Sequence, residues 1–110
     1  MDERDRRTME RAVESARIAI EHVSSGGPEW RSDLKTVDAA AKRVEEVSEQ
    51  LRRVSLQTQA AMPSIRWRDA KGMRDVLAHD YGHVDVEILA DVVETDLPGL
   101  IIAIEAALTE

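Results

Sequence analysis

The chain has 110 residues, no cysteine and a formal net charge of -7, from 22 acidic and 15 basic side chains. That length allows one hydrophobic core, so we expect a single domain over residues 1–110. The absence of cysteine excludes disulfide scaffolds, thiol nucleophiles and cysteine-based zinc sites. Hydrophobic residues make up 43% of the chain while phenylalanine is absent, which predicts an aliphatic core.

Apolar residues at helical spacing predict two long helices in the first half of the chain. The first covers residues 8–23 and stops at the Ser-Ser-Gly-Gly-Pro stretch of residues 24–28. The second stripe begins at Leu34 and continues to Thr58, which indicates a helix of about seven turns. Pro63 ends this helix, because proline disfavours helical geometry in the residue before it.

Three shorter helices are expected in the second half. One starts near residues 64–67 and stops at Gly82, a residue suited to a left-handed C-cap. Asp85 predicts the N-cap of the next helix, and Asp96 with Pro98 marks the first turn of the last one. Short connections make neighbouring amphipathic helices antiparallel, so the predicted fold class is all-α, an up-and-down helical bundle of four to five helices.

The charge is unevenly distributed along the chain. Residues 1–65 are close to neutral, residues 66–74 carry four basic groups against one acidic group, and residues 75–110 hold nine acids without any lysine or arginine. The longest apolar run, residues 99–104, is too short to cross a bilayer, and no signal-peptide pattern follows the N-terminus. We therefore expect a soluble cytoplasmic protein with one local basic block and no membrane association.

The densest group of reactive side chains is the segment 74–81, Arg-Asp-Val-Leu-Ala-His-Asp-Tyr. It resembles the R-x4-H-x-Y signature of the HEPN superfamily, and the flanking blocks resemble its HepT-like branch. Those blocks are Pro-Ser-Ile-Arg-Trp at 63–67, Gly-Met-Arg-Asp at 72–75, Val-Asp at 84–85 and Asp-Leu-Pro-Gly-Leu at 96–100. The resemblance covers about residues 63–100 at the level of motifs and predicts a HEPN-like helical domain.

The chain departs from the family pattern in two places. The usual Ile-Gly-Glu-Ala of the second helix is Val-Ser-Glu-Gln at 47–50, so close helix packing through a glycine is not implied there. The residue after the arginine is more often asparagine, whereas here it is Asp75.

The resemblance implies a ribonuclease toxin that works without a metal or other cofactor, and the residue types suit that chemistry. His79 can transfer protons near neutral pH, and Arg74 can bind phosphate through its planar guanidinium. Asp75 lies one helical turn before His79 and could orient the imidazole. We expect Arg66, Arg68 and Lys71 of the basic block to contact RNA phosphates.

Spacing on a regular helix raises a geometric problem for this site. Arg74 and His79 are separated by a rotation of about 500°, so they would point about 140° apart. Either the helix loosens before Gly82, or the site is completed across a homodimer in which both copies present this segment to one cleft. The resemblance favours a homodimer with the motif at its interface.

The same family resemblance implies a partner and a mode of control. The tyrosine at position 81 is equivalent to the residue that accepts AMP from a minimal nucleotidyltransferase antitoxin, and AMP groups beside Arg74 would block RNA binding. The alternative function is a non-catalytic HEPN module that binds a nucleotidyltransferase or a nucleotide. A zinc site at His79 and His83 is disfavoured by the intervening Gly82 and by the lack of a third ligand. Trp67 is expected to anchor the core rather than to stack on a base.

Overall fold

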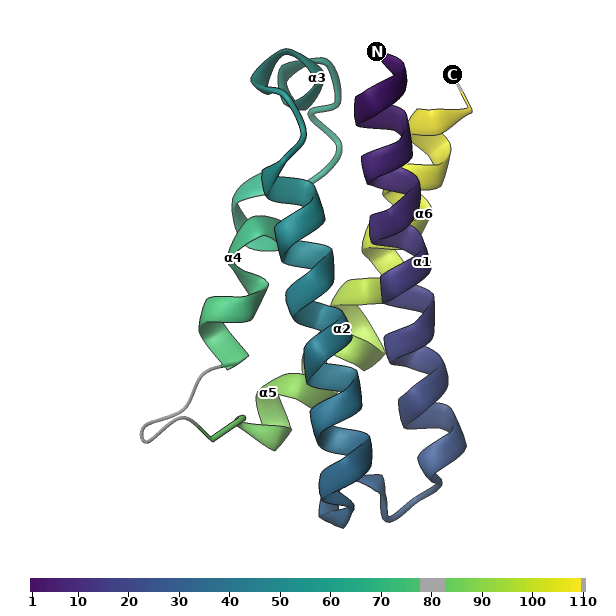
Figure 1. Ribbon diagram of the computed structural model, residues 1–110, viewed down its shortest axis with the longest axis vertical. Helices are drawn as coiled ribbons and strands as arrows, with labels where there is room; N and C mark the ends of the chain where they lie inside the picture. Colours follow the sequence, from purple (N-terminus) through teal and green to yellow (C-terminus); the bar gives the residue numbers. More distant parts are fainter. Residues whose placement is uncertain (78–82, 110) are drawn as a thin grey trace.

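The computed structural model describes residues 1–77 and 83–109, and most of them lie in helices (Figure 1). In chain order the elements are α1 (Glu3–Gly26), the short 3-10 turn η1 (Trp30–Ser32), α2 (Leu34–Arg52), α3 (Leu56–Ala61), α4 (Trp67–Leu77), α5 (Val86–Asp91), the π-helix η3 (Val92–Asp96) and α6 (Leu97–Leu108). The predicted all-α fold class is confirmed. No helix in the described ranges is both long enough and apolar enough to cross a membrane.

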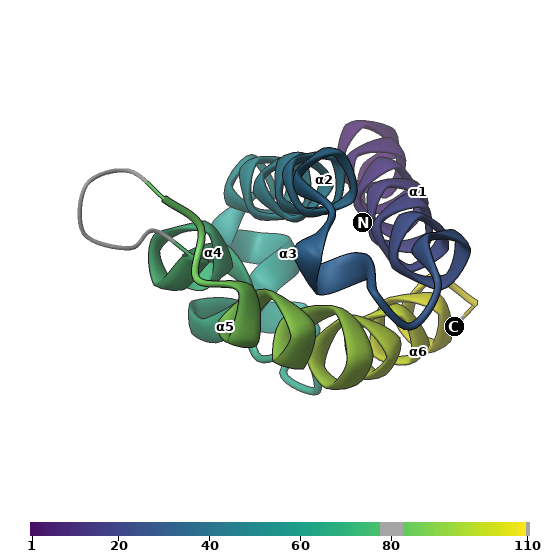
Figure 2. The same ribbon diagram turned by 90° about the horizontal axis from the view of Figure 1, so that it is seen from below.

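The helices form a bundle around one core. α1 and α2 pack along each other, α4 packs against α2, and α6 packs against α1. Seen along the bundle, α1 and α2 form one side, while α4, α5 and α6 close the other (Figure 2). The up-and-down arrangement therefore follows from short connections between amphipathic helices, as the sequence predicts.

The core is aliphatic, as expected from a chain without phenylalanine. The fully buried residues include Met9 on α1, Val44 and Leu51 on α2, and Leu97 and Ile104 on α6. Trp30 is a buried aromatic exception on η1. Many of the remaining buried positions on α1 and α2 are alanine or valine, and such small side chains let these helices approach closely.

The second predicted helix is wrong in one respect: it is broken after Arg52. α2 ends there, and Ser55 caps the separate helix α3 by accepting a hydrogen bond from the Thr58 amide at 3.2 Å. The cause is tertiary. Asp5 of α1 accepts hydrogen bonds from the Ser55 amide (3.2 Å), the Ser55 hydroxyl (2.6 Å) and the Thr58 hydroxyl (2.5 Å). A buried carboxylate therefore holds the start of α3 out of line with α2.

The last two predicted helices are joined, which also differs from expectation. Asp96 makes no capping hydrogen bond, and the chain passes from α5 through η3 into α6 without a loop. Pro98 has no backbone N–H, so it cannot supply the next helical hydrogen bond. The π-helix accommodates it, because the Leu97 amide donates to the Val92 carbonyl, which lies five residues back rather than four. Asp85 does cap α5, accepting from the amides of Glu87 and Ile88, as predicted.

α4 begins where the sequence predicts. Trp67 is its first residue, packs against the core and donates from Nε1 to the Met62 carbonyl at 3.0 Å. The expected anchoring role of this tryptophan is confirmed. The predicted stop at Gly82 lies outside the described residues.

The contact between Asp5 and α3 makes the stability of the fold dependent on pH. The hydrogen bonds from the Ser55 and Thr58 hydroxyls hold the pKa of Asp5 below its usual range, although burial opposes this. A carboxylate with a lowered folded-state pKa stabilises the fold fully above its unfolded pKa of about 3.9. That contribution is lost as the pH falls through the lower folded pKa.

We predict that Asp5→Asn lowers the free energy of unfolding at pH 7 by about 1–3 kcal/mol, because a charged acceptor of buried hydrogen bonds is lost. Urea denaturation between pH 2.5 and 7 measures the effect, and the difference from wild type should shrink toward the acid end. Asp38→Asn is the matched control, since Asp38 is exposed on α2. Equal stability curves for wild type and Asp5→Asn would contradict the assignment.

Candidate functional site

Arg74 lies in the last turn of α4, and its side chain is held against α2. Its Nη1 donates to Oε1 of Glu49, and its Nε is 4.0 Å from Oδ1 of Asp75. The Arg74 and Glu49 side chains are 41% and 42% exposed, so the guanidinium can still be reached from solvent. An arginine in this state can offer its remaining N–H groups to a phosphate oxygen.

Asp75, the next residue on α4, is also bound by α2. Nη2 of Arg52 lies 3.2 Å from Oδ2 of Asp75, while Nε of the same arginine donates to the Lys71 carbonyl at 3.0 Å. Glu49, Arg74, Asp75 and Arg52 thus alternate in charge along the edge between α2 and α4. The role expected for Asp75, orienting His79, involves a partner outside the described residues.

Ser48 makes the buried contact beneath this charged edge. Its side chain is 0% exposed, its hydroxyl donates to the Ala70 carbonyl at 3.1 Å, and its oxygen accepts from the Arg74 amide at 3.2 Å. The serine that replaces the family's usual glycine therefore touches the backbone of the candidate phosphate-binding residue.

His79 and Tyr81 belong to residues 78–82, which lie outside the described part of the chain. The two ends of the connection that carries them are joined, since the Asp85 amide donates to the Leu77 carbonyl at 3.0 Å. The spacing problem between Arg74 and His79 therefore stays with residues outside the described part of the chain.

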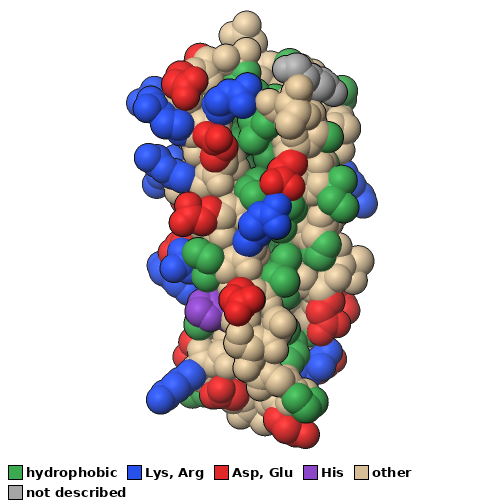
Figure 3. Space-filling model, turned by 90° about the vertical axis from the view of Figure 1, so that its right-hand side faces the viewer, with side chains coloured by type: hydrophobic (Ala, Val, Ile, Leu, Met, Phe, Trp, Pro, Cys, Tyr) green, Lys and Arg blue, Asp and Glu red, His purple; other side chains and the backbone are tan. Residues whose placement is uncertain are grey.

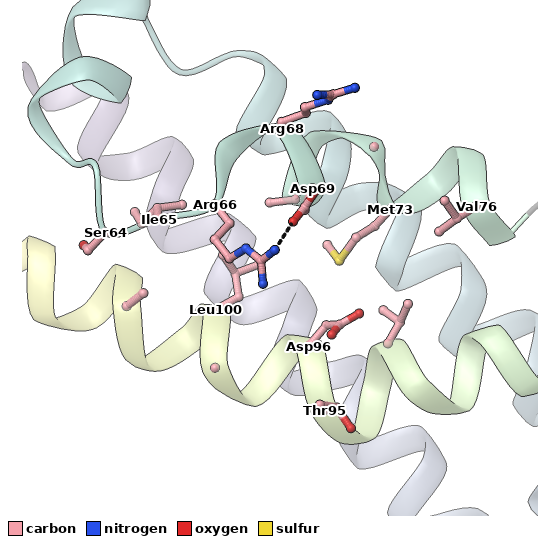
Figure 4. A pocket seen from close by; sticks show the side chains of 15 residues that line it. Ser64, Ile65, Arg66, Arg68, Asp69, Met73, Val76, Thr95, Asp96 and Leu100 are labelled. Carbon is pink, nitrogen blue, oxygen red and sulfur yellow. Dashed lines mark ion pairs between the residues drawn. The ribbon is translucent and has the colours of Figure 1, made fainter.

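The basic block of the sequence does not form one patch with Arg74. Arg66 pairs with Asp69 at 2.9 Å on the opposite side of α4, and Lys71 donates to the Gln59 side chain of α3 at 3.0 Å. Arg68 extends away from Arg66 (Figure 4). The four positive charges within residues 66–74 are therefore distributed around α4 and its start, and acidic side chains partly neutralise them.

A groove of about 790 Å³ lies between α4 and the η3–α6 segment (Figure 4). Its walls include Val76 and Leu100, and its rims carry charged residues of both signs. Gly72 and Gly99 also line it, and a Cβ atom added at either would meet no neighbouring atom within 4 Å. Glycine inside a helix costs about 1 kcal/mol relative to alanine, so packing within one copy does not explain these two glycines.

Among the described residues, the face formed by α1 and α6 shows no grouping of charge that would indicate a binding site (Figure 3). On the face formed by α1 and α6, acidic and basic side chains are mixed rather than gathered by sign (Figure 3). Arg17 on this face pairs with Glu105 at 2.8 Å. Within residues 1–77 and 83–109, no three histidine, aspartate or glutamate side chains gather in a way that could hold a metal ion.

The sequence reasoning missed Glu49 and Arg52 as neighbours of the candidate site. Both lie on α2 outside its apolar stripe, where a charged residue usually indicates only a solvated face. The available signal was the altered block at 47–50, which was interpreted as a change in helix packing rather than as part of the site.

Comparison with known proteins agrees with this geometry. An all-α bundle with an arginine at the end of α4, followed by a histidine and a tyrosine, fits the HEPN class of proteins. The family model described as Ribonuclease HepT-like matches residues 9–107. The chain therefore belongs to the HepT-like ribonuclease family of this class, which confirms the resemblance derived from the sequence blocks.

A curated relative, named Probable ribonuclease HepT, comes from Thermococcus cleftensis. It is 35% identical to this chain over 68 residues, and the match spans 62% of each protein. No solved structure gives a significant match.

Proposed function

We propose that this chain is a metal-independent endoribonuclease in which Arg74 binds the scissile phosphate and His79 transfers protons. The 2′-hydroxyl of one nucleotide loses its proton and attacks the adjacent phosphorus. The bond from phosphorus to the 5′-oxygen of the next nucleotide breaks, and that oxygen gains a proton. The products are a 2′,3′-cyclic phosphate and a 5′-hydroxyl, and the step needs no metal, oxidant or second substrate.

The observation that carries this proposal is the family match over residues 9–107, which includes the whole Arg74-x4-His79-x-Tyr81 segment. The state of Arg74 supports it. A guanidinium that is 41% exposed and fixed at a helix edge can stabilise the charge that builds on the phosphorane oxygens. In this proposal Asp75 helps to orient His79, while Arg66, Arg68 and Lys71 make outlying contacts with the RNA backbone.

A phosphate that binds Arg74 must compete with Glu49, which already forms an ion pair with this arginine. The pair is about 40% exposed on both sides, and such pairs contribute about 0–1 kcal/mol, so a phosphate can displace or share this contact at low cost. Glu49 thus keeps Arg74 oriented in the absence of RNA without blocking it.

We predict that the purified chain degrades RNA in the presence of EDTA and that His79→Ala and Arg74→Ala each reduce cleavage at least 100-fold, about the contribution of a general acid–base or charge-stabilising group. Release of 2′,3′-cyclic phosphate ends from a labelled oligonucleotide measures the activity. Arg17→Ala is the matched control, because Arg17 is also a half-exposed, ion-paired arginine but lies on α1. Cleavage that disappears in EDTA would reject the metal-independent mechanism. Folded protein without activity would favour the alternative, a non-catalytic HEPN module.

Regulation forms the second part of the proposal: Tyr81 accepts AMP from a minimal nucleotidyltransferase antitoxin. Tyr81 follows Arg74 by seven residues, within about 20° of the same helical face if the helix were regular. Each AMP would add a negatively charged phosphate beside the arginine that RNA needs.

Co-expression with a nucleotidyltransferase encoded beside this chain should add one or more AMP masses to wild type, and none to Tyr81→Phe. Intact-protein mass spectrometry measures the difference, and RNA cleavage should fall in proportion to the modified fraction. An equal mass gain in wild type and Tyr81→Phe would reject Tyr81 as the acceptor.

The third part concerns assembly: the chain acts as a homodimer whose copies meet across the groove between α4 and α6. This groove is not lined by Arg74, so the proposed interface differs from the shared cleft at the motif that the resemblance implies. Val76, 53% exposed at the groove, and the unfilled positions of Gly72 and Gly99 allow the backbone of a second helix to approach closely. One end of the groove carries Arg66 and Arg68 with a single acid, Asp69, which pairs with Arg66, and the other end carries Asp96 (Figure 4). A two-fold axis across the groove would set the basic end of one copy against the acidic end of the other.

We predict that wild type has the mass of two chains by light scattering at micromolar concentration and that Gly99→Gln has the mass of one. Glutamine favours the helix more than glycine does, so the substitution should fill the groove without unfolding the monomer. Ile102→Gln is the control, because Ile102 is 71% exposed on the same helix and does not line the groove. A dimer that survives Gly99→Gln, or a monomeric wild type, would contradict this interface.

A further inference from the structure

We infer that Ser48 is a positioning residue for Arg74: its hydroxyl ties α2 to the backbone of α4 at the point where the arginine side chain leaves the helix. The inference rests on the proposed function, because it assigns Ser48 a role in the work of Arg74. Its evidence is a buried contact that the charged residues of the site do not require.

The contact involves both members of one helical pair. In a regular α-helix the Ala70 carbonyl and the Arg74 amide bond to each other, since they are four residues apart. The Ser48 hydroxyl donates to this carbonyl at 3.1 Å and accepts from this amide at 3.2 Å. It therefore fixes where the first turn before Arg74 lies relative to α2, both along and around the axis of α4.

This hydroxyl is not needed to satisfy buried polar groups. Without it, the geometry of an α-helix would let the Arg74 amide donate to the Ala70 carbonyl, so neither group would be orphaned. The surroundings are buried, with Ser48 0%, Ala70 5% and Met73 5% exposed, so bulk solvent does not reach the contact. Removing the hydroxyl should therefore shift α4 slightly rather than unfold it.

Neighbouring residues of α2 hold both parts of the arginine. Ser48 binds its amide, and Glu49 binds its guanidinium. Arg52, one turn further along α2, donates to the carbonyl of Lys71, as Ser48 does to the carbonyl of Ala70. Side chains of α2 therefore bind the backbone of successive residues of α4. Since Arg74 is proposed to meet a charge that develops only during the reaction, a displaced arginine should slow catalysis more than it weakens RNA binding.

The test compares Ser48→Ala with Val37→Ala, a buried substitution on the same helix that lies about 16 Å from Ser48 along the helix axis. In steady-state RNA cleavage, Ser48→Ala should lower kcat by about tenfold with KM changed less than about twofold. Val37→Ala should keep the wild-type kcat at temperatures where it is folded, although its cavity destabilises the core. A second measurement, the ¹⁵N NMR signals of the Arg74 amide and Nε, should show shifts in Ser48→Ala and none in Val37→Ala.

The results for Ser48→Ala and for wild type test the role of Ser48 and the proposed function separately. A Ser48→Ala variant with wild-type kcat and unshifted Arg74 signals would overturn the inference. So would loss of folding in Ser48→Ala by circular dichroism, because the role would then be structural. If wild type cleaves no RNA, the proposed function fails, and the Arg74 signals alone then decide whether Ser48 positions the arginine.

Discussion

The attachment of α4 to α2 is the interaction on which the candidate site depends. Ser48 and Arg52 of α2 donate to successive backbone carbonyls of α4, at 3.1 Å and 3.0 Å, and Glu49 holds the Arg74 side chain. Hydrogen bonds from side chains to a helix backbone fix both the register and the rotation of that helix, which apolar packing alone leaves adjustable. α4 therefore presents Arg74 at a defined place on the edge of the bundle.

That attachment is possible only because the chain turns back after α2. A single helix from Leu34 to Thr58, as the apolar stripe suggests, would carry the following segment away from α2. Asp5 prevents this by binding Ser55 and Thr58, and the short helix α3 then leads the chain back to Trp67. The buried carboxylate of Asp5 on α1 thus places α4 where side chains of α2 can form hydrogen bonds with its backbone.

Charge is arranged around the candidate site in a way that the total of -7 conceals. Arg74 stands between Glu49 and Asp75, and the other basic residues of its segment face away from it or have partners of their own. An anionic ligand would therefore meet a few oriented cations rather than a broad positive surface. Such an arrangement favours recognition of single phosphates over strong non-specific binding to nucleic acid.

The sequence by itself determined the fold class, the aliphatic core and the family, because helical periodicity, composition and ordered motif blocks are local properties that survive in any packing. It also located the starts of α4 and α5, since Trp67 and Asp85 act through neighbours within a few residues. The break after Arg52 and the contact of Ser48 with Arg74 were decided only by tertiary structure, whereas the π-helix before α6 has a local cause that the apolar pattern does not show. The break depends on a contact between residues 50 positions apart, and the position of Arg74 on one between residues 26 positions apart. The π-helix depends on how the chain accommodates Pro98. The periodicity of apolar residues contains no information about any of these contacts.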